Sequence, residues 1–294
     1  MKNKLVLGTA NFGDKKYAKE SKKLSKFKIK NIIKYALNKG IFFFDTANSY
    51  KSEKNIKDKK SSVFTKLKPI KENLKTKNVS EVDRIIFKSI KESQKKLGVK
   101  KIYCILVHRV DDLLIHNGYV IKHLIKYKKE GLIGNIGISI DRYKNIKKII
   151  LNKHIKFIQV PVNIYDKRWK IFFNKKFLKY SKNKIFIARS IFLRGLFSKK
   201  KWPDKIRKFK IEIQRLNKKI MKKLMIKKME QIMFLYVKSL NKFQYIIFGA
   251  SSIKHVKQIS NLQKLKKISN IDIQYIERIT KNVNKVFYNI ISWY

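Results

Sequence analysis

Short apolar runs alternate with longer amphipathic segments along the whole chain. Each run has the length and the β-propensity of a strand that is buried on both faces, as the strands of a parallel sheet are. Eight strands are predicted in this way, over residues 5–8, 41–45, 62–66, 101–108, 135–139, 157–161, 184–188 and 245–248.

The intervening segments repeat their apolar residues at helical spacing. In residues 25–39, for example, Ile29, Ile32 and Ile33 mark one face of a helix, and Gly40 is placed to end it. The last segment is predicted as an amphipathic helix that is additional to the alternating pattern. The other predicted helices cover residues 49–59, 80–97, a segment that ends near 131, 143–151, 169–180, two within 205–241, 252–262 and, as the additional one, 271–291.

Eight strands that alternate with helices, without a stretch that looks like a linker, predict an α/β fold. The pattern is that of a (β/α)₈ TIM barrel with an additional C-terminal helix, as a single domain over residues 1–294. A doubly wound open sheet is the alternative, and it needs a G-x-G-x-x-G loop after an early strand. Neither Gly8 and Gly13 nor the glycines within 131–137 have that spacing. The barrel is therefore favoured.

The charge of the chain is extreme, with a formal net value of +55 at pH 7. A nucleic-acid-binding surface would concentrate basic residues on one face and interleave them with aromatic ones. Here lysines recur from Lys2 to Lys285, in nearly every polar position. We therefore expect no specific nucleic-acid partner, although weak, salt-sensitive attraction to polyanions follows from the charge alone.

The remaining composition narrows the class of protein. Cys104 is the single cysteine, which excludes an internal disulfide and suits a reducing compartment. No run of 18 apolar residues occurs, and the start of the chain lacks a signal-peptide core, so we expect a cytoplasmic protein without a membrane span. No Cys/His cluster has metal-ligand spacing, so no metal is predicted. The sequence leaves the oligomeric state open.

Three successive strands end in an ionisable residue, namely Asp45, Lys66 and His108. Because side chains alternate along a strand and parallel strands end at the same face of a barrel, we expect the three to meet at the barrel mouth. Tyr50 follows Asp45 by five positions, and Asn48-Ser49 supplies a possible cap for a helix that would return Tyr50 to the same place. Considered separately, Asp45 could also be a helix-capping residue and Tyr50 an ordinary surface residue.

This group of side chains suits proton donation from a phenol. An ammonium group beside Tyr50 would lower the pKa of the phenol, and Asp45 would hold Lys66 charged and in position. His108 could then orient a substrate carbonyl towards Tyr50. Hydride addition to a carbonyl and proton abstraction next to a carbonyl both suit the same four residues.

Motifs along nearly the whole chain match one family in order. The sequence resembles the aldo-keto reductases, which are (β/α)₈ barrels that reduce aldehydes and ketones with NADPH, sometimes NADH, through an Asp-Tyr-Lys-His tetrad. The resemblance implies Tyr50 as proton donor, Asp45 and Lys66 as the groups that tune it, and His108 as the orienter of a small carbonyl substrate. The matching stretches are residues 8–13, 44–50, 65–66, 107–109, 136–139, Gln159 with Asn163, 189–196 and 249–252. The stretch 189–196 is similar to members associated with surface-polysaccharide gene clusters.

The resemblance also implies a set of cofactor-binding residues. Ser139 and Gln159 should hold the nicotinamide carboxamide, and Arg189 stands where many members place an aromatic ring against the nicotinamide. His255, with the nearby Lys254 and Lys257, favours NADPH, because these side chains could meet a 2′-phosphate. The full predicted set is Thr9, Ser139, Gln159, Arg189, Ser190, Phe192, Gly249, Ser251, Ser252 and His255.

The chain departs from the family pattern at several positions, two of which, His255 and Ile259, belong to the adenosine end of the cofactor site. Ile140, His255 and Ile259 replace residues that are common in the family, and Lys51 stands where Gly commonly follows the Tyr. These departures keep open a second hypothesis, a barrel that binds the cofactor without reducing a substrate and acts as a sensor or a subunit. A polyanion-binding protein is a third hypothesis, which rests on charge alone.

Overall fold

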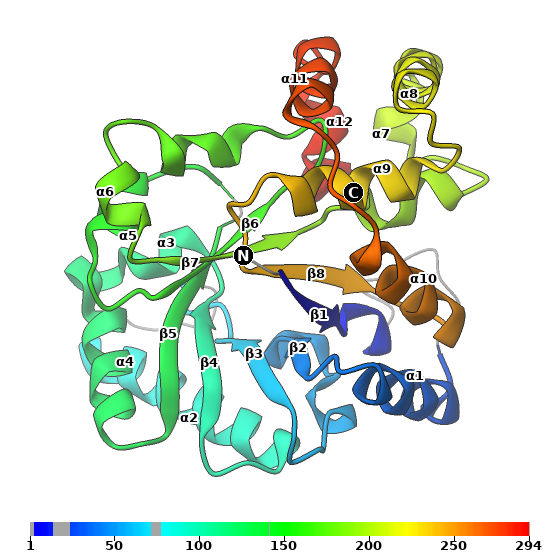
Figure 1. Ribbon diagram of the computed structural model, residues 1–294. Coiled ribbons are helices and arrows are strands. Elements are labelled where there is room, and N and C mark those ends of the chain that lie inside the picture. Colours follow the sequence, from blue (N-terminus) through cyan, green and yellow to red (C-terminus); the bar gives the residue numbers. More distant parts are fainter. Residues whose placement is uncertain (1–2, 14–23, 72–77, 141, 294) are drawn as a thin grey trace.

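The computed structural model describes residues 3–13, 24–71, 78–140 and 142–293. Within these ranges eight parallel strands close into a barrel in sequence order, with β8 paired to β1 (Figure 1). This confirms the predicted (β/α)₈ fold class. The strands are β1 (Lys4–Gly8), β2 (Phe43–Asp45), β3 (Ser62–Lys66), β4 (Ile102–Val107), β5 (Ile133–Ser139), β6 (Phe157–Pro161), β7 (Ile185–Arg189) and β8 (Tyr245–Gly249).

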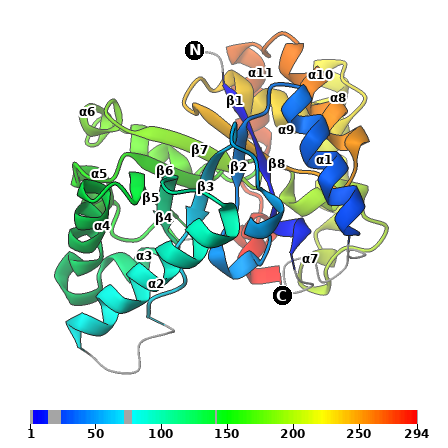
Figure 2. The same ribbon diagram turned by 90° about the horizontal axis from the view of Figure 1, so that it is seen from below.

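Helices surround the barrel. On one side α1 packs beside α10, and on another α2 packs against α4 (Figure 2). The α-helices are α1 (Lys26–Asn38), α2 (Val79–Leu97), α3 (Val110–Leu113), α4 (Tyr119–Lys129), α5 (Ile146–Leu151), α6 (Leu178–Ser181), α7 (Asp204–Arg207), α8 (Lys210–Leu224), α9 (Met229–Ser239), α10 (Ile253–Lys264), α11 (Asn270–Ile279) and α12 (Lys285–Tyr288). The 3₁₀ helices are η1 (Ala10–Phe12), η3 (Asn48–Tyr50), η4 (Glu53–Asn55), η5 (Ile115–Gly118), η6 (Arg168–Phe173), η7 (Leu193–Ser198) and η8 (Ile290–Trp293).

Apolar residues form two cores, as the alternation of side chains along each strand requires. One core lies between the strands and the helices, and the other fills the inside of the barrel. The inner core holds Phe64, Cys104 and Leu106, with Phe43 packed against it, which confirms the predicted inward faces. Ile41 is an exception, because it precedes β2 and packs in the outer core.

The register of the strands places the ionisable residues at one level. Asp45 pairs with Phe64, so Lys66 lies two residues further along β3. Lys66 in turn pairs with Leu106, so His108 lies two residues further along the next chain segment. This stepwise offset is the stagger that tilts the strands of a closed barrel.

Several predicted helices are divided in the structure. Residues 49–59 form two 3₁₀ turns, η3 and η4, and residues 169–180 form η6 and α6. The region 205–241 holds two long helices, α8 and α9, as predicted, and Met225 ends α8 with a left-handed φ of 53°; the four-residue α7 precedes them. The predicted single helix 271–291 is wrong: the chain breaks after α11 and starts again at α12, where the Asn284 side chain caps the N-terminus.

Among the residues that the structure describes, none of the helices is both long and apolar enough to cross a membrane. In the same part of the chain, no group of three or more His, Cys, Asp and Glu side chains is placed to hold a metal ion.

Candidate active site

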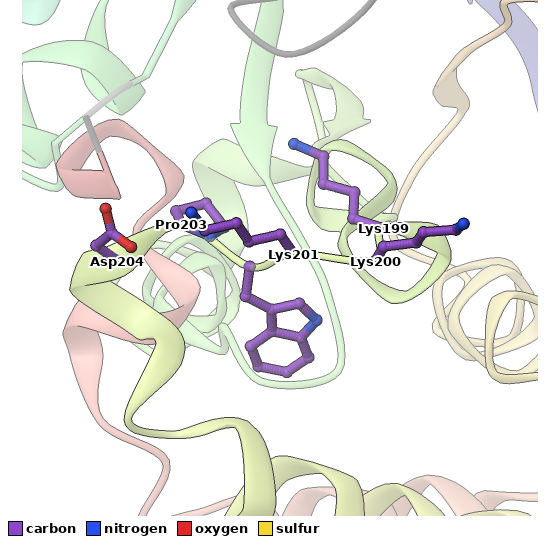
Figure 3. Close-up of a pocket in the computed structure, with 6 residues that line it drawn as sticks. Lys199, Lys200, Lys201, Pro203 and Asp204 are labelled. Carbon is purple, nitrogen blue, oxygen red and sulfur yellow. The ribbon is translucent and has the colours of Figure 1, made fainter.

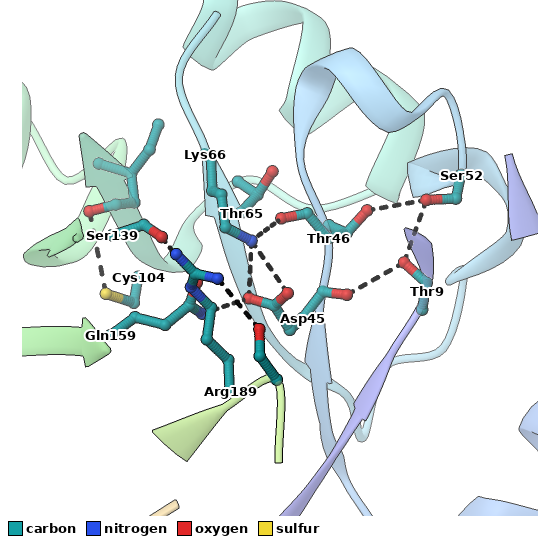
Figure 4. A network of polar contacts seen from close by, with 12 residues as sticks. Thr9, Asp45, Thr46, Ser52, Thr65, Lys66, Cys104, Ser139, Gln159 and Arg189 are labelled. Atoms are coloured by element: carbon teal, nitrogen blue, oxygen red, sulfur yellow. Dashed lines mark hydrogen bonds and ion pairs between the residues drawn. The ribbon is translucent and has the colours of Figure 1, made fainter. Parts of the chain in front are cut away.

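A buried ion pair joins the ends of β2 and β3. The ammonium group of Lys66 donates to both carboxylate oxygens of Asp45, at 2.8 and 2.9 Å, and to the carbonyl oxygen of Thr46 at 2.7 Å (Figure 4). The Lys66 side chain is 2% exposed and that of Asp45 10%. The structure therefore confirms that Asp45 and Lys66 converge at the barrel mouth.

Two further polar side chains extend this pair across the barrel. Gln159, on β6, donates from Nε2 to Asp45 Oδ1 at 2.7 Å. Ser139, at the end of β5, donates from Oγ to Gln159 Oε1 at 2.9 Å. All three side chains belong to buried residues. The two residues predicted to hold the carboxamide thus form one network with the acid of the tetrad (Figure 4).

Tyr50 ends the short η3 turn and lies over the ion pair. The Lys66 Nζ atom is 5.2 Å from the centre of the Tyr50 ring. The Tyr50 and His108 rings are 6.2 Å apart between centroids and nearly perpendicular, at 81°. The structure therefore brings Asp45, Tyr50, Lys66 and His108 together, as predicted from the strand ends, while their roles stay predictions.

The expected lowering of the Tyr50 pKa is wrong for this geometry. Burial raises the pKa of the Tyr50 phenol well above its usual value, and the charge of Asp45 raises it further. The guanidinium groups of Arg189 and Arg194 lower the same pKa only in part. The ammonium group of Lys66 donates to both oxygens of the Asp45 carboxylate. The phenol therefore holds its proton at neutral pH.

His108 is a neutral base in this site. Burial, and then the positive charges of Lys66, Arg109 and Arg189, lower the pKa of His108 to about 3, although a backbone contact with Leu67 acts in the opposite direction. Its Nδ1 atom is buried and has no hydrogen-bond partner among the described residues. An uncharged imidazole offers one donor and one acceptor nitrogen.

Small hydroxyl side chains support the end of β2. Thr9 donates to the carbonyl oxygen of Asp45 through its backbone N–H at 2.9 Å and through its hydroxyl at 3.1 Å. The Ser52 hydroxyl joins the hydroxyls of Thr9 and Thr46, at 3.0 and 3.1 Å. Thr9 is fully buried, so the structure places it in the support of the site. Its predicted contact with a cofactor stays a prediction.

Glu53 is a buried carboxylate that sequence reasoning missed. Its Oε1 atom accepts hydrogen bonds from Thr65 on β3 and from Ser93 on α2, each at 2.7 Å. Lys96 Nζ lies 3.8 Å from the other carboxylate oxygen. Because Glu53 follows Tyr50 by three residues, these bonds tie the Tyr50 turn to the barrel. One signal in the sequence could have pointed to Glu53. It is the only acidic residue within the lysine-rich stretch 51–57, in a chain that has only 19 acidic residues.

The predicted helix cap at residues 48–49 is wrong. Asn48 does not cap η3, whose N-cap is Ala47 without a side-chain hydrogen bond. Its side-chain amide instead points to α2, where it donates to Ser89 O, Glu92 Oε2 and Ser93 Oγ at 3.4–3.5 Å. Burial of Asn48 against α2 explains the difference, since the amide is 41 to 45 residues from its partners in sequence.

The end of β7 carries Arg189 and a strained turn. The Arg189 guanidinium donates to the Ile140 carbonyl oxygen at 2.7 Å and to the Ser190 hydroxyl at 3.1 Å. Its Nε atom is buried and has no partner in the described part of the chain. Ser190, Leu193 and Arg194 adopt left-handed φ values of 61°, 49° and 53°, which cost energy for residues other than glycine. Phe192 is partly buried against the outer core.

The predicted adenosine end lies at the start of α10. Ser252 caps this helix, because its hydroxyl accepts from the His255 backbone N–H at 3.3 Å. The His255 ring lies 3.3 Å from both the backbone nitrogen and the hydroxyl of Ser251. Gly249, Lys254 and Lys257 are exposed here, on the same short segment. A helix N-terminus with exposed basic side chains favours anions such as phosphate groups.

These features fit a dinucleotide. Two buried atoms at the barrel mouth, Nδ1 of His108 and Nε of Arg189, have no hydrogen-bond partner among the residues that the structure describes, and they can bond to a ligand. The α10 N-terminus offers an anion site at the β8 end of the barrel. Ser139, Gln159 and Arg189 would hold the nicotinamide end, and Ser251, Ser252 and His255 the phosphate end.

Two surface hollows lie away from this group of residues. One, of about 540 Å³, is lined by residues 199–204 after η7. Figure 3 shows the side chains of Lys199, Lys200 and Lys201 pointing in three different directions, so the lysines do not converge on one point. The other, of about 440 Å³, lies at the opposite, N-terminal ends of the strands, next to Ile102 and Gly134. Neither hollow contains a predicted site residue.

Comparison with known proteins identifies a family. The model of the Aldo/keto reductase family matches residues 4–281. No curated protein matches the sequence.

Solved structures with the same fold include several enzymes. The aldo-keto reductase AKR11C1 from Bacillus halodurans, in its holo form, is 19% identical over 94% of this chain and 91% of its own, with a TM-score of 0.73. The glycerol dehydrogenase AKR11B4 from Gluconobacter oxydans is 20% identical over 95% and 92%, with a TM-score of 0.69. An aldo/keto reductase from Klebsiella pneumoniae, solved with NADP and acetate, is 15% identical over 94% and 90%, with a TM-score of 0.66. At these identities the likeness shows the shared fold.

Proposed function

Since this chain belongs to the aldo/keto reductase family, a family of oxidoreductases that use NAD(P)H, we propose that it reduces an aldehyde or ketone to an alcohol. The cofactor is NADPH in preference to NADH, and the barrel acts as one domain over residues 1–294. The observation that carries the proposal is the grouping of Tyr50 and His108 over the buried pair of Lys66 and Asp45.

Tyr50 is the proton donor. Its raised pKa keeps the phenol protonated across the neutral pH range, so a proton is available for transfer to the substrate. When bound, the reduced nicotinamide supplies the hydride to the carbonyl carbon. The alkoxide oxygen that develops is a stronger base than a phenolate, so it can take the proton even from a weakly acidic phenol.

Lys66 and Asp45 act after the proton has moved rather than before. Loss of the proton leaves a negative charge on Tyr50 next to the ammonium group of Lys66, which lies 5.2 Å from the ring centre. A charge that is already in place stabilises this anion without reorganisation. Asp45 keeps Lys66 protonated and directed in its buried position.

His108 orients the substrate. With a pKa lowered to about 3, its imidazole is uncharged at neutral pH, which excludes His108 as a charged acid. A neutral ring beside Tyr50 can hold the carbonyl oxygen by a hydrogen bond and direct it to the phenol. The link to surface-polysaccharide clusters belongs to the same proposal and points to sugar-derived carbonyl compounds as first substrates to try.

The test mixes the purified protein with NADPH and a panel of aldehydes, ketones and keto-sugars, and follows the loss of nicotinamide absorbance. Turnover that Tyr50→Phe abolishes and Tyr35→Phe, on α1, leaves unchanged would support the proposal. Turnover retained by Tyr50→Phe would contradict the role of Tyr50. Tight NADPH binding without turnover of any carbonyl would instead support the hypothesis of a sensor or subunit.

A further inference from the structure

Arg189 holds a fixed positive charge inside the group of predicted site residues. It is the last residue of β7, and its guanidinium reaches across to the end of β5, where it donates to Ile140 O at 2.7 Å. Figure 4 shows this guanidinium beside Gln159 and Ser139. A second donor atom bonds Ser190 at 3.1 Å, so the orientation of the group is set from two sides.

The positive charge of Arg189 acts on the side chains of Tyr50 and His108. Burial has the largest effect on these two groups and on Tyr143, raising the pKa of Tyr50 and Tyr143 and lowering that of His108, and the charge of Arg189 acts to lower each pKa. A carbonyl held between Tyr50 and His108 must have its hydride donor within about 3–3.5 Å. The nicotinamide ring therefore has to lie in the region where the charge of Arg189 acts.

We propose that Arg189 makes this site discriminate between the two redox states of the nicotinamide, so that the reduced cofactor binds more tightly than the oxidised one. The inference rests on the proposed function and adds a property of the same site. The reduced ring is neutral, whereas the oxidised pyridinium ring carries one positive charge. A guanidinium beside the ring repels only the oxidised form, while a neutral aromatic side chain at the same place would repel neither.

The presence of arginine rather than lysine at position 189 supports a specific role for the guanidinium group. Of the 74 basic residues of the chain only nine are arginine, since lysine fills almost every position that merely has to be charged. A planar guanidinium can lie flat against a ring and keep two hydrogen bonds, whereas a lysine ammonium is a mobile point charge. Arg189 makes those two bonds to the backbone of Ile140, just after β5, and to the Ser190 hydroxyl.

The consequence is a shift in the redox balance of the bound cofactor. The couple exchanges two electrons and one proton as a hydride, so a tenfold preference for the reduced form raises its bound reduction potential by about 30 mV. The bound cofactor is then a weaker reductant, and the oxidised product leaves the site more easily. The site is thereby suited to work in the direction of alcohol oxidation as well as carbonyl reduction.

The test measures the dissociation constants of NADPH and NADP⁺, the former by the fluorescence of the bound cofactor and the latter by its displacement. In the wild-type protein the ratio of the constant for NADP⁺ to that for NADPH should be about ten or more. Arg189→Gln, which is neutral but keeps hydrogen-bonding atoms, should lower the ratio about tenfold. Arg189→Lys, which keeps the charge, should hold it within about threefold, and Arg84→Gln, at an exposed arginine on α2, should leave it unchanged.

Each other outcome overturns the inference. A ratio near one in the wild-type protein would do so without any variant, so the test does not depend on how the variants fold. If Arg189→Gln and Arg189→Lys lower the ratio of the two dissociation constants equally, the preference depends on the shape of the side chain and not on its charge. Binding of both cofactor forms with equal strength leaves the proposed reductase function standing, whereas a wild-type protein that binds neither form would contradict that function too.

Discussion

A β-carbon built on Gly13 would lie 1.7 Å from the carbonyl oxygen of Tyr50. The loop after β1 therefore packs against the backbone of the Tyr50 turn with no room for a side chain. This contact supports the backbone at Tyr50, and the hydrogen bonds of Glu53 to β3 and α2 hold the chain three residues further on.

A side chain at position 13 should disturb this close approach. Gly13→Ala should destabilise the fold by about 1–3 kcal/mol, because backbone atoms must move to admit the methyl group, and it should lower kcat by displacing Tyr50. Denaturant unfolding and kinetics would measure both. Gly249→Ala is the matched control for stability, since its β-carbon meets Asn11 Nδ2 at an ordinary 3.5 Å. Equal unfolding free energies for the two variants would contradict the prediction.

A buried and an exposed lysine, two positions apart, should differ in their contribution to stability. Lys66→Met leaves the Asp45 carboxylate buried without its cation and should cost about 3–5 kcal/mol. Lys68→Met breaks a pair with Glu92 of the same 2.8 Å length, but with side chains 34% and 29% exposed, and should cost about 1 kcal/mol or less. Urea unfolding of both variants measures the difference. A similar loss in each would show that burial of the Lys66 pair does not matter.

His108 should make the protein less stable in acid. Its pKa of about 3 in the folded protein lies below the usual value of about 6.5, so between these pH values the unfolded chain binds a proton that the folded one does not. Stability should therefore fall by up to about 1.4 kcal/mol for each pH unit from about 6.5 down to about 3. In His108→Gln this part of the slope should vanish, as unfolding at a series of pH values would show. Parallel slopes would argue against the lowered pKa.

Glu53 should position Tyr50 without touching a substrate. Glu53→Ala leaves the hydroxyls of Thr65 and Ser93 without their acceptor and should cost about 1–3 kcal/mol. It should also lower kcat more than it changes the NADPH dissociation constant. Glu53→Gln keeps an acceptor oxygen and should recover most of both losses. If the glutamine variant is as impaired as the alanine one, the carboxylate charge and not its hydrogen bonds is what matters.

The charge of +55 should produce only nonspecific attraction to nucleic acid. Because such binding depends on counterion release, the affinity for duplex DNA should fall by about 10³-fold or more between about 50 and 200 mM salt. Filter binding or fluorescence anisotropy on two unrelated DNA sequences would test this. Binding that survives high salt, or that prefers one sequence, would revive the third hypothesis of a polyanion-binding protein.

The sequence by itself determined the barrel and the members of its site. Strand-length apolar runs separated by helical segments specify a parallel sheet, and alternation of side chains sends Asp45 and Lys66 to the same side of adjacent strands. Both are properties of local spacing, so they can be read without coordinates. The grouping of Tyr50 with His108 follows from the same reasoning.

Only the tertiary structure decided the electrostatics and the support of that site. The pKa of Tyr50 is raised rather than lowered, because burial of the phenol and the charge of Asp45 outweigh the positive charges of the two arginines that act on it. The Asn48 amide points to α2, and the Glu53 carboxylate is buried next to the Tyr50 turn. Both side chains make hydrogen bonds with residues 12 to 45 positions away in the sequence. Burial and distance arise from contacts between segments far apart in the chain, and a local pattern carries no information about them.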